Sequence, residues 1–410
     1  MADNHSKVDG ARVLADLNAL RAIGAYKTGV HRPTFSEPHM RSLEWLAERL
    51  PEAALTAEID GIGNVLGTSA KPGSKLLADS HLESQNFAGW LDGPLGVVYA
   101  LEAARVINPD PNVKGAVEVA AWCDEEGHFG HFLGSRSYIG EVTEADIDEA
   151  SDRSSDRAMR QALRDVGLAG RPRAKAEHGR HIGYFEAHIE QGLTLEGARL
   201  KIGVVTSIVG IWQYRITFAG EQNHAGTTRM EDRRDAGLAL ARLCVAIDDR
   251  FPASCGPRTV WTTGRITLDP GAPSIIPGHA EILFQIRDDN PEIIERLEEL
   301  LRDLTAEVSA MGRCSAELSR VRTGAPALMD TRFQQAIEDA SAAFASGKSL
   351  RMPSGAGHDA QVLAKIMPAG MLFVPSIGGI SHHWSENTDD ADIVTGAQVF
   401  VETCRLLLAQ

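Results

Sequence analysis

The stretch that decides the fold is LLADSHLESQNFAGWLDGPLGVVYALEAARVI, residues 76–107. It opens with a short apolar run that predicts a strand ending at His81. It closes with apolar residues at helical spacing, which predict a helix over 93–107, opened by Asp92-Gly93. A strand that leads through a loop into a helix is typical of an α/β sheet covered by helices. Sites in such sheets form beyond the carboxyl ends of the strands, so His81 and Asp92 are candidate site residues.

The flanking sequence continues the same alternation. Residues 11–50 predict helices, the second of which ends at Pro51. AVEVAAW (116–122) predicts a strand that runs into acidic residues, and MLFVPS (371–376) predicts another that leads through a glycine-rich turn to His382. We therefore expect an α/β fold in which a large domain contains a mixed sheet covered by helices.

The middle of the chain predicts a second, smaller domain. Residues 211–220 alternate like a half-exposed strand, and two long helices are expected at 234–251 and 291–312. Further strands are expected at 259–269 and 280–288. Strand, helix, strand, strand, helix is a self-contained α+β unit. We predict a large domain formed by residues 1–209 and 326–410, with residues 210–325 inserted as the smaller domain.

Composition excludes several classes of function. The 410 residues carry a formal net charge of -15, which disfavours a nucleic-acid partner. No apolar run is long enough for a transmembrane helix, and the first residues lack the pattern of a signal peptide. The five cysteines are scattered and never spaced as CxxC, so a disulfide framework is not expected. We expect a cytoplasmic enzyme that does not act at a membrane.

Four short segments supply residues that commonly bind metals, each near a predicted strand end or an adjoining turn. Their candidate residues are His81 with Asp92, Glu125 with Glu126, His188, and His382. Imidazole and carboxylate groups together bind zinc-like divalent cations, and one aspartate can bridge two of them. Two metal ions roughly 3.5–4 Å apart can polarise a carbonyl and activate a water. Adjacent Glu125 and Glu126 could divide the work, one as a ligand and the other as a general base.

Each of these signals has an ordinary alternative. A single histidine is more often a structural residue, Asp92-Gly93 could be only a turn, and an acidic run is usually a solvated surface. SGAGHDA (354–360) contains Ser354, His358 and Asp359, but a catalytic triad is recognised by geometry, and their close spacing cannot establish one. The joint occurrence of the metal-binding segments in one order favours the two-metal interpretation.

That order resembles the M20 metallopeptidase-like family, in the branch of N-carbamoyl-L-amino-acid hydrolases, allantoate amidohydrolases and β-ureidopropionases. The similarity covers nearly the whole chain, and HIEQG, NHAGTT, SGAGHDA and the FVPS-GISH segment are its most specific parts. The motifs that carry it are IDGIGNVLG (59–67), SHL with Asp92-Gly93, EEG (125–127), LGSRSYIG (133–140), HIEQG (188–192), NHAGTT (223–228), SGAGHDA (354–360) and FVPSIGGISH (373–382).

The resemblance implies a role for each matching residue. Asp92 would bridge two divalent metal ions (Zn, Mn, Co or Ni), with His81 and His188 completing one site and Glu126 and His382 the other. Glu125 would be the general base. His224 would stabilise the oxyanion from across a dimer interface, and Arg287 would bind the substrate carboxylate. Gln191, Ser274 and Gly357 match positions near the substrate. The smaller domain would act as a lid and form a homodimer.

The resemblance also implies hydrolysis of the carbamoyl (ureido) C–N bond of an N-carbamoyl-L-amino acid or an allantoate-like acid. An aminoacylase or dipeptidase that cleaves an N-acyl amino acid is the alternative within the fold. A binding protein with an inactive site is an alternative from another class. It is disfavoured because every ligand and the base are present.

Several positions depart from the family pattern without changing a predicted ligand. Glu83 stands where the family has aspartate, Ser274 where it has asparagine, and Arg229 where it has proline. The loop before Asp92 adds Phe87 and Trp90, and Trp384 follows His382 closely. We expect Phe87, Trp90 and Trp384 either to line an entrance for an apolar or aromatic substrate side chain or simply to pack the loops.

Overall fold

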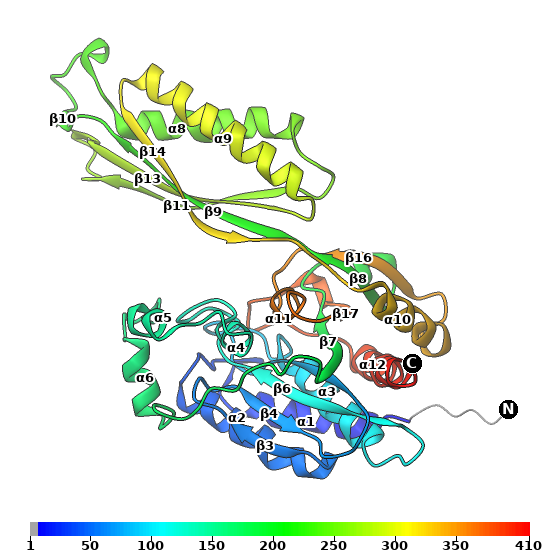
Figure 1. The fold of residues 1–410 in the computed structure, drawn as a ribbon. Coiled ribbons are helices and arrows are strands. Elements are labelled where there is room, and N and C mark those ends of the chain that lie inside the picture. Colours follow the sequence, from blue (N-terminus) through cyan, green and yellow to red (C-terminus); the bar gives the residue numbers. More distant parts are fainter. Residues whose placement is uncertain (1–6) are drawn as a thin grey trace. The chain divides into compact units, whose positions relative to one another are not determined.

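The computed structural model describes residues 7–410, which form two compact units (Figure 1). The first unit contains the chain up to Thr206 together with Leu328–Gln410, and the second contains Ser207–Ala327. The predicted boundaries, at 209/210 and 325/326, lie close to these positions. The two units are described separately below.

The first unit is built on a mixed sheet of nine strands, with helices packed against it (Figure 1). Its central strands are parallel, and the neighbouring strands toward both edges are antiparallel, as the sequence predicted for a mixed α/β sheet. The strands, in order across the sheet, are β15 (Ala327–Leu328), β8 (Ile202–Ile208), β17 (Ala369–Val374), β7 (His181–Ile189), β5 (Ser74–His81), β6 (Gly115–Trp122), β4 (Val65–Thr68) and β3 (Thr56–Ile59), and β16 (Ser349–Ser354) pairs with β8.

The register of the central strands brings the predicted ligands to one end of the sheet. β5 and β7 are parallel, with Asp79 opposite Glu186, and each strand continues for two residues to a histidine, His81 or His188. β6 is buried along its whole length because it is covered on both faces, as is typical of parallel strands in α/β proteins. The same end of β6 therefore delivers the acidic segment that follows Trp122.

The predicted helices of the first unit are present. α3, which follows Asp92, packs on β5 and β6, and most of its buried residues belong to the main apolar core. The helices are α1 (Gly10–Ala22), α2 (Glu37–Arg49), α3 (Pro94–Ile107), α4 (Leu133–Tyr138), α5 (Glu144–Glu149), α6 (Met159–Asp165), α7 (Thr194–Ala198), α10 (Thr331–Phe344), α11 (Asp359–Leu363) and α12 (Asp390–Leu408), with 3-10 turns η1 (Leu50–Ala53) and η4 (Ile377–Gly379) and a small hairpin β1 (Ala25–Tyr26) and β2 (Gly29–Val30).

The second unit is an antiparallel sheet with two long helices on one face (Figure 1). Alternate residues of β9 and β13 are buried beneath α8 and α9, which explains the alternation seen in the sequence. β14 was not predicted, because its alternating residues are mainly polar. The elements are β9 (Gly210–Ala219), β10 (Asn223–His224), η2 (Met230–Asp232), α8 (Ala236–Arg250), η3 (Phe251–Ala253), β11 (Val260–Asp269), β12 (Ile275–Ile276), β13 (His279–Asp288), α9 (Pro291–Gly312) and β14 (Ser315–Gly324).

None of the helices within residues 7–410 combines the length and apolar character needed to cross a membrane.

Candidate metal centre

The five predicted ligands converge in the first unit around the carboxylate of Asp92. Asp92 Oδ1 lies 3.0 Å from His188 Nε2 and 3.7 Å from His81 Nε2. Asp92 Oδ2 faces the other way and lies 3.3 Å from His382 Nε2, which is itself 3.7 Å from Glu126 Oε2. Each oxygen of Asp92 thus belongs to a separate group of three donor residues, whose donor atoms lie within 4.8 Å of one another.

These two groups fit two cations that share Asp92. One group contains His81, Asp92 and His188, and the other contains Asp92, Glu126 and His382. This mixture of imidazole and carboxylate donors suits zinc-like divalent ions. Four of the five ligands are buried, whereas the side chain of His382 is 53% exposed, so the second group is the one open to solvent.

The backbone directs the imidazoles of the first group toward Asp92. His188 Nδ1 lies 2.9 Å from the carbonyl oxygen of Ile189, and His81 Nδ1 lies 3.2 Å from that of Glu83. A neutral ring that donates through Nδ1 keeps the lone pair of Nε2 for a metal ion. The two rings are therefore already oriented for ligation through Nε2.

Negative charge accumulates at the centre. Burial raises the pKa of Glu126 to about 7, and the charge of Asp92 adds to this effect. Burial also raises the pKa of Glu125, and repulsion from the charge of Glu126 raises it further. Burial opposes ionisation of Asp92 too, but when no cation is bound, hydrogen bonds from His188 and His382 hold its pKa well below the usual value. Bound cations would relieve this repulsion, so the electrostatics agree with the donor set.

Glycine is required at position 93, next to the bridging carboxylate. Gly93 has a φ of +86°, in the region that L-residues rarely adopt. A Cβ atom placed there would lie 2.5 Å from the ring of His81. Asp92-Gly93 is thus more than a turn, because the missing side chain lets the His81 ring approach the start of α3.

Glu125 borders the first group of ligands. Its Oε2 lies 3.8 Å from His81 Nε2, and its side chain is 11% exposed. Asp124, just before it, has a φ of +60°, so the backbone turns sharply after β6. The adjacent glutamates are consequently placed differently, with Glu126 facing His382 and Glu125 facing His81.

Gln191, predicted near the substrate, lies on the bridging aspartate. Its Nε2 donates to Asp92 Oδ2 at 3.1 Å and to Ser381 Oγ at 2.9 Å, and it lies 3.5 Å from His382 Nε2. The side chain is therefore positioned to hold the carboxylate that would bridge the metals as well as to face the open side of the centre.

Three residues that sequence analysis missed support the ligands. Glu386 Oε1 accepts hydrogen bonds from the backbone nitrogens of Leu91 and Asp92. Gln85 donates to both carboxylate oxygens of Glu126, from its backbone and from its side chain. Arg153 donates to the carbonyl oxygen of Glu126 at 3.1 Å, although it lies in a segment without a recognisable motif.

The SGAGHDA segment lies beside the centre and does not form a catalytic triad. The His358 ring packs edge-on against the His188 ring, with centroids 4.6 Å apart, and His358 Nε2 lies 2.9 Å from Ser354 Oγ. Asp359 instead accepts a hydrogen bond from Ser135 Oγ. Gly357 precedes His358, and a Cβ atom there would lie 2.8 Å from the ring of Phe132.

The other predicted site residues, His224, Ser274 and Arg287, lie in the second unit. β10 pairs with β12, with His224 opposite Ile275, and the carbonyl oxygen of Ser274 accepts a hydrogen bond from the backbone of Ala225. Arg287 lies near the end of β13, opposite Ile211 of β9. His224 and Ser274 are thus neighbours, whereas Arg287 lies toward the opposite end of the sheet.

Of the two roles expected for Trp90, the structure supports packing. Trp90 is only 3% exposed and belongs to the core. The guanidinium carbon of Arg21 lies over the Trp90 ring, 4.5 Å from the ring centre. Phe87 is 48% exposed and stacks on His31. Trp384 is partly exposed beneath Lys27, whose Nζ lies 4.1 Å from the ring centre.

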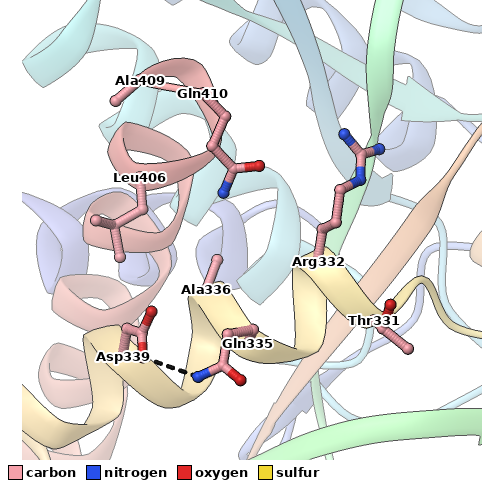
Figure 2. A pocket seen from close by; sticks show the side chains of 8 residues that line it. All are labelled: Thr331, Arg332, Gln335, Ala336, Asp339, Leu406, Ala409 and Gln410. Carbon is pink, nitrogen blue, oxygen red and sulfur yellow. Dashed lines mark hydrogen bonds between the residues drawn. The ribbon is translucent and has the colours of Figure 1, made fainter.

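A surface pocket of about 550 Å³ lies between α10 and α12 (Figure 2). Its lining includes Asp339, which accepts a hydrogen bond from Gln335, and none of the five ligands. The candidate centre is therefore defined by its converging donor groups and not by this pocket.

The sheet and the Asp92-centred ligands are those of a metal-dependent hydrolase, and the chain belongs to the Peptidase family M20/M25/M40, whose model matches residues 77–406. It is a hydrolase of C–N bonds. The chain is 32% identical to an N-carbamoyl-L-amino-acid amidohydrolase of Paenarthrobacter aurescens, over 98% of both chains. It is 30% identical to an allantoate amidohydrolase of Bacillus subtilis, over 91% of this chain and 92% of the relative.

A solved structure agrees with this assignment. A crystal structure of an amidase of the hydantoinase/carbamoylase family from Burkholderia phymatum has a TM-score of 0.89 and 42% identity, and the match covers 99% of both chains.

Proposed function

We propose that the protein hydrolyses the carbamoyl C–N bond of an N-carbamoyl-L-amino acid or a related ureido acid. The observation that carries the proposal is the pair of ligand groups that share Asp92, with Glu125 beside them. The activities named for the relatives point to ureido compounds as the substrate class.

Two divalent ions, when held by His81, Asp92, Glu126, His188 and His382, would polarise the substrate carbonyl and lower the pKa of a water. Glu125 is placed to take a proton from the attacking water and pass it to the leaving nitrogen. Gln191 keeps the Asp92 carboxylate in place.

The second unit would supply the remaining substrate contacts. His224 Nδ1 accepts hydrogen bonds from the backbone nitrogens of Gly226 and Thr227, so the neutral ring carries its proton on Nε2. That N–H suits the stabilisation of an oxyanion. The planar guanidinium of Arg287 suits the substrate carboxylate, and Ser274 and Gly357 are further candidates for substrate binding.

The geometry of the second unit supports a homodimer. Ile211 lies opposite Arg287 and Ala219 lies opposite His279, and strands rise about 3.3 Å per residue. Arg287 is therefore roughly 25 Å from the end of β9 after which the chain continues to His224. A small amino-acid derivative cannot span that distance. We propose that Arg287 comes from the same subunit as the metal centre and His224 from its partner, with the second unit acting as lid and dimerisation domain.

Water adds to the carbonyl, and the C–N bond to the amino acid breaks. The products are the free amino acid and carbamic acid, which decomposes to ammonia and carbon dioxide.

We also propose a reducing, cytoplasmic location, which the five unpaired cysteines support.

The test is a panel of N-carbamoyl and N-acyl amino acids and allantoate, supplied to protein reconstituted with Zn, Mn, Co or Ni. We expect ammonia and free amino acid from a ureido substrate, and loss of activity after metal chelation. Release of a carboxylic acid without ammonia would instead support an aminoacylase or dipeptidase, the alternative that Ser274, in place of asparagine, leaves open. Inclusion of aromatic N-carbamoyl amino acids tests whether Phe87 and Trp384 contact the substrate.

A further inference from the structure

Glu83 connects the first metal ligand to the segment that carries the base. It lies two residues beyond the end of β5, and its side chain is fully buried. Its carbonyl oxygen lies 3.2 Å from His81 Nδ1, within hydrogen-bond distance. The hydrogen-bond partner of the imidazole is thus the backbone of Glu83, and the nearer carboxylate oxygen, Oε1, lies 3.7 Å from His81 Nδ1.

The carboxylate of Glu83 binds the backbone that follows β6. Glu83 Oε1 accepts a hydrogen bond from the backbone nitrogen of Glu125 at 2.6 Å and a longer one from that of Glu126 at 3.4 Å. These N–H groups belong to the residues proposed as base and ligand. Both hydrogen bonds end on a buried carboxylate, and hydrogen bonds in such a setting are electrostatically stronger than in water.

The second oxygen of Glu83 faces a histidine whose proton position is set by another contact. His39 Nδ1 accepts a hydrogen bond from the backbone nitrogen of Phe35 at 3.0 Å, so its proton lies on Nε2. His39 Nε2 is 3.7 Å from Glu83 Oε2, and both side chains are completely buried. His39 thus faces the carboxylate on the side opposite Glu125.

Buried Arg32 fixes the backbone on either side of Glu83. Its Nε donates to the carbonyl oxygen of Leu82 at 2.6 Å, and its own carbonyl oxygen accepts a hydrogen bond from the backbone of Ser84. The segment that carries Glu83 is therefore held independently of its side chain. A change in that side chain alone should leave His81 in place while releasing the backbone of Glu125 and Glu126.

We propose that Glu83 is a positioning residue whose carboxylate sets the position of the Glu125–Glu126 backbone relative to His81. This inference rests on the proposed function, since the proposed function assigns Glu125 and Glu126 their roles. The length of the side chain matters, because aspartate is one methylene shorter and would withdraw the acceptor from the Glu125 backbone. Glutamine retains an acceptor oxygen at the same distance from the chain.

The test compares Glu83→Gln, Glu83→Asp and Glu83→Ala. A misplacement on the order of 1 Å in an active site can lower the rate by about 100-fold, so we expect kcat of the alanine and aspartate variants to fall on that scale. KM should change much less, and both metal ions should remain bound. Glutamine should restore most of kcat. Glu102→Gln is the control, because Glu102 is a buried glutamate on α3 that accepts a hydrogen bond from the backbone nitrogen of Asp9. Glu102 also accepts hydrogen bonds from Arg12 and is not one of the candidate ligands.

A second measurement does not depend on turnover. The visible absorption spectrum of the Co²⁺-substituted protein reports the geometry of the ligands, and we expect it to change in the aspartate and alanine variants but little in Glu83→Gln. Wild-type kcat and an unchanged spectrum in Glu83→Ala would overturn the proposal. If that variant does not fold, equal behaviour of the aspartate and glutamine variants would overturn it. If the wild type cleaves no ureido acid, the proposed function fails, while the spectra still test Glu83.

Discussion

Glu386 Oε1 accepts a hydrogen bond from the backbone nitrogen of Asp92 at 3.1 Å, so a residue close to the last ligand fixes the ligand that would bridge both metals. Its other oxygen lies 3.0 Å from Ser381 Oγ, and that hydroxyl also lies 3.3 Å from Asp92 Oδ2. Glu386 therefore joins two segments that are far apart in sequence.

Replacement of Glu386 by alanine should weaken metal binding. Outer partners of metal ligands typically contribute 10–100-fold in affinity, and we expect a loss of about that size. Competition with a chromogenic chelator would measure it. Glu402→Ala is the control, because Glu402 is equally buried but pairs with Arg405 on α12. Equal metal affinity in both variants would show that Glu386 has no role at the centre.

Neighbouring glutamates should respond differently to the same substitution. Glu125→Gln should retain two metal ions and lose at least about 100-fold in kcat, the usual contribution of general acid–base catalysis. Glu126→Gln should lose affinity for one ion, because Glu126 belongs to the second ligand group. Metal analysis of the purified variants, combined with steady-state kinetics, checks both expectations. Full activity in Glu125→Gln would remove Glu125 as the base.

Two inactive variants should restore each other if His224 acts across a dimer. In a mixed dimer of His224→Ala and Glu125→Gln subunits, one centre has an intact Glu125 and receives an intact His224 from its partner. Random mixing makes about half of the dimers mixed, and only one of the two centres in each mixed dimer is intact. The expected activity is therefore about one quarter of wild type. Refolding or coexpression of differently tagged subunits provides the measurement. Absence of recovery in isolated mixed dimers would place His224 and Glu125 in the same subunit's site.

Glu118, which lies outside the metal centre, should make the free energy of unfolding depend on pH. It lies on β6 and accepts hydrogen bonds from His181 and Arg180. Burial alone would raise its pKa, but these contacts lower it from 4.5 to about 2. Because the folded-state pKa is the lower one, the stabilisation is present above pH 4.5 and is lost as the pH falls from there to about 2.

Urea unfolding of metal-free wild type and Glu118→Gln checks this expectation. The variant should be less stable by about 2–3 kcal/mol near pH 7, and the difference should shrink as the pH falls through the acidic range. Glu58→Gln, at an exposed position on β3, is the control. A difference in stability that stays constant from pH 7 to pH 3 would contradict the assignment.

The candidate ligands could be selected from sequence because each lies beside a locally recognisable feature, and the resemblance to the family then assigned them to two cation positions. His81 ends an apolar strand, Asp92 precedes a helix, and parallel pairing of β5 with β7 brings His188 beside His81. The supporting residues could not be predicted, since Glu386 and Gln85 acquire their roles only when loops that are distant in sequence meet.

Burial of the aromatic residues depended on packing that spacing does not reveal. Trp90 and Phe87 lie in the same loop, yet Trp90 is covered by Arg21 of α1 and Phe87 is exposed beside His31. β14 was missed because polar residues dominate its exposed positions, and its place in the sheet comes from backbone pairing with β9. In both cases a partner elsewhere in the chain determined the outcome.

The order of the ligands along the chain has a consequence for biosynthesis. His81, Asp92 and His188 all precede the second unit, whereas His382 follows it. A ribosome therefore delivers every donor of one cation position early in translation and the last donor of the other only near termination. A nascent chain stalled within the second unit can offer a complete donor set for only one of the two ions.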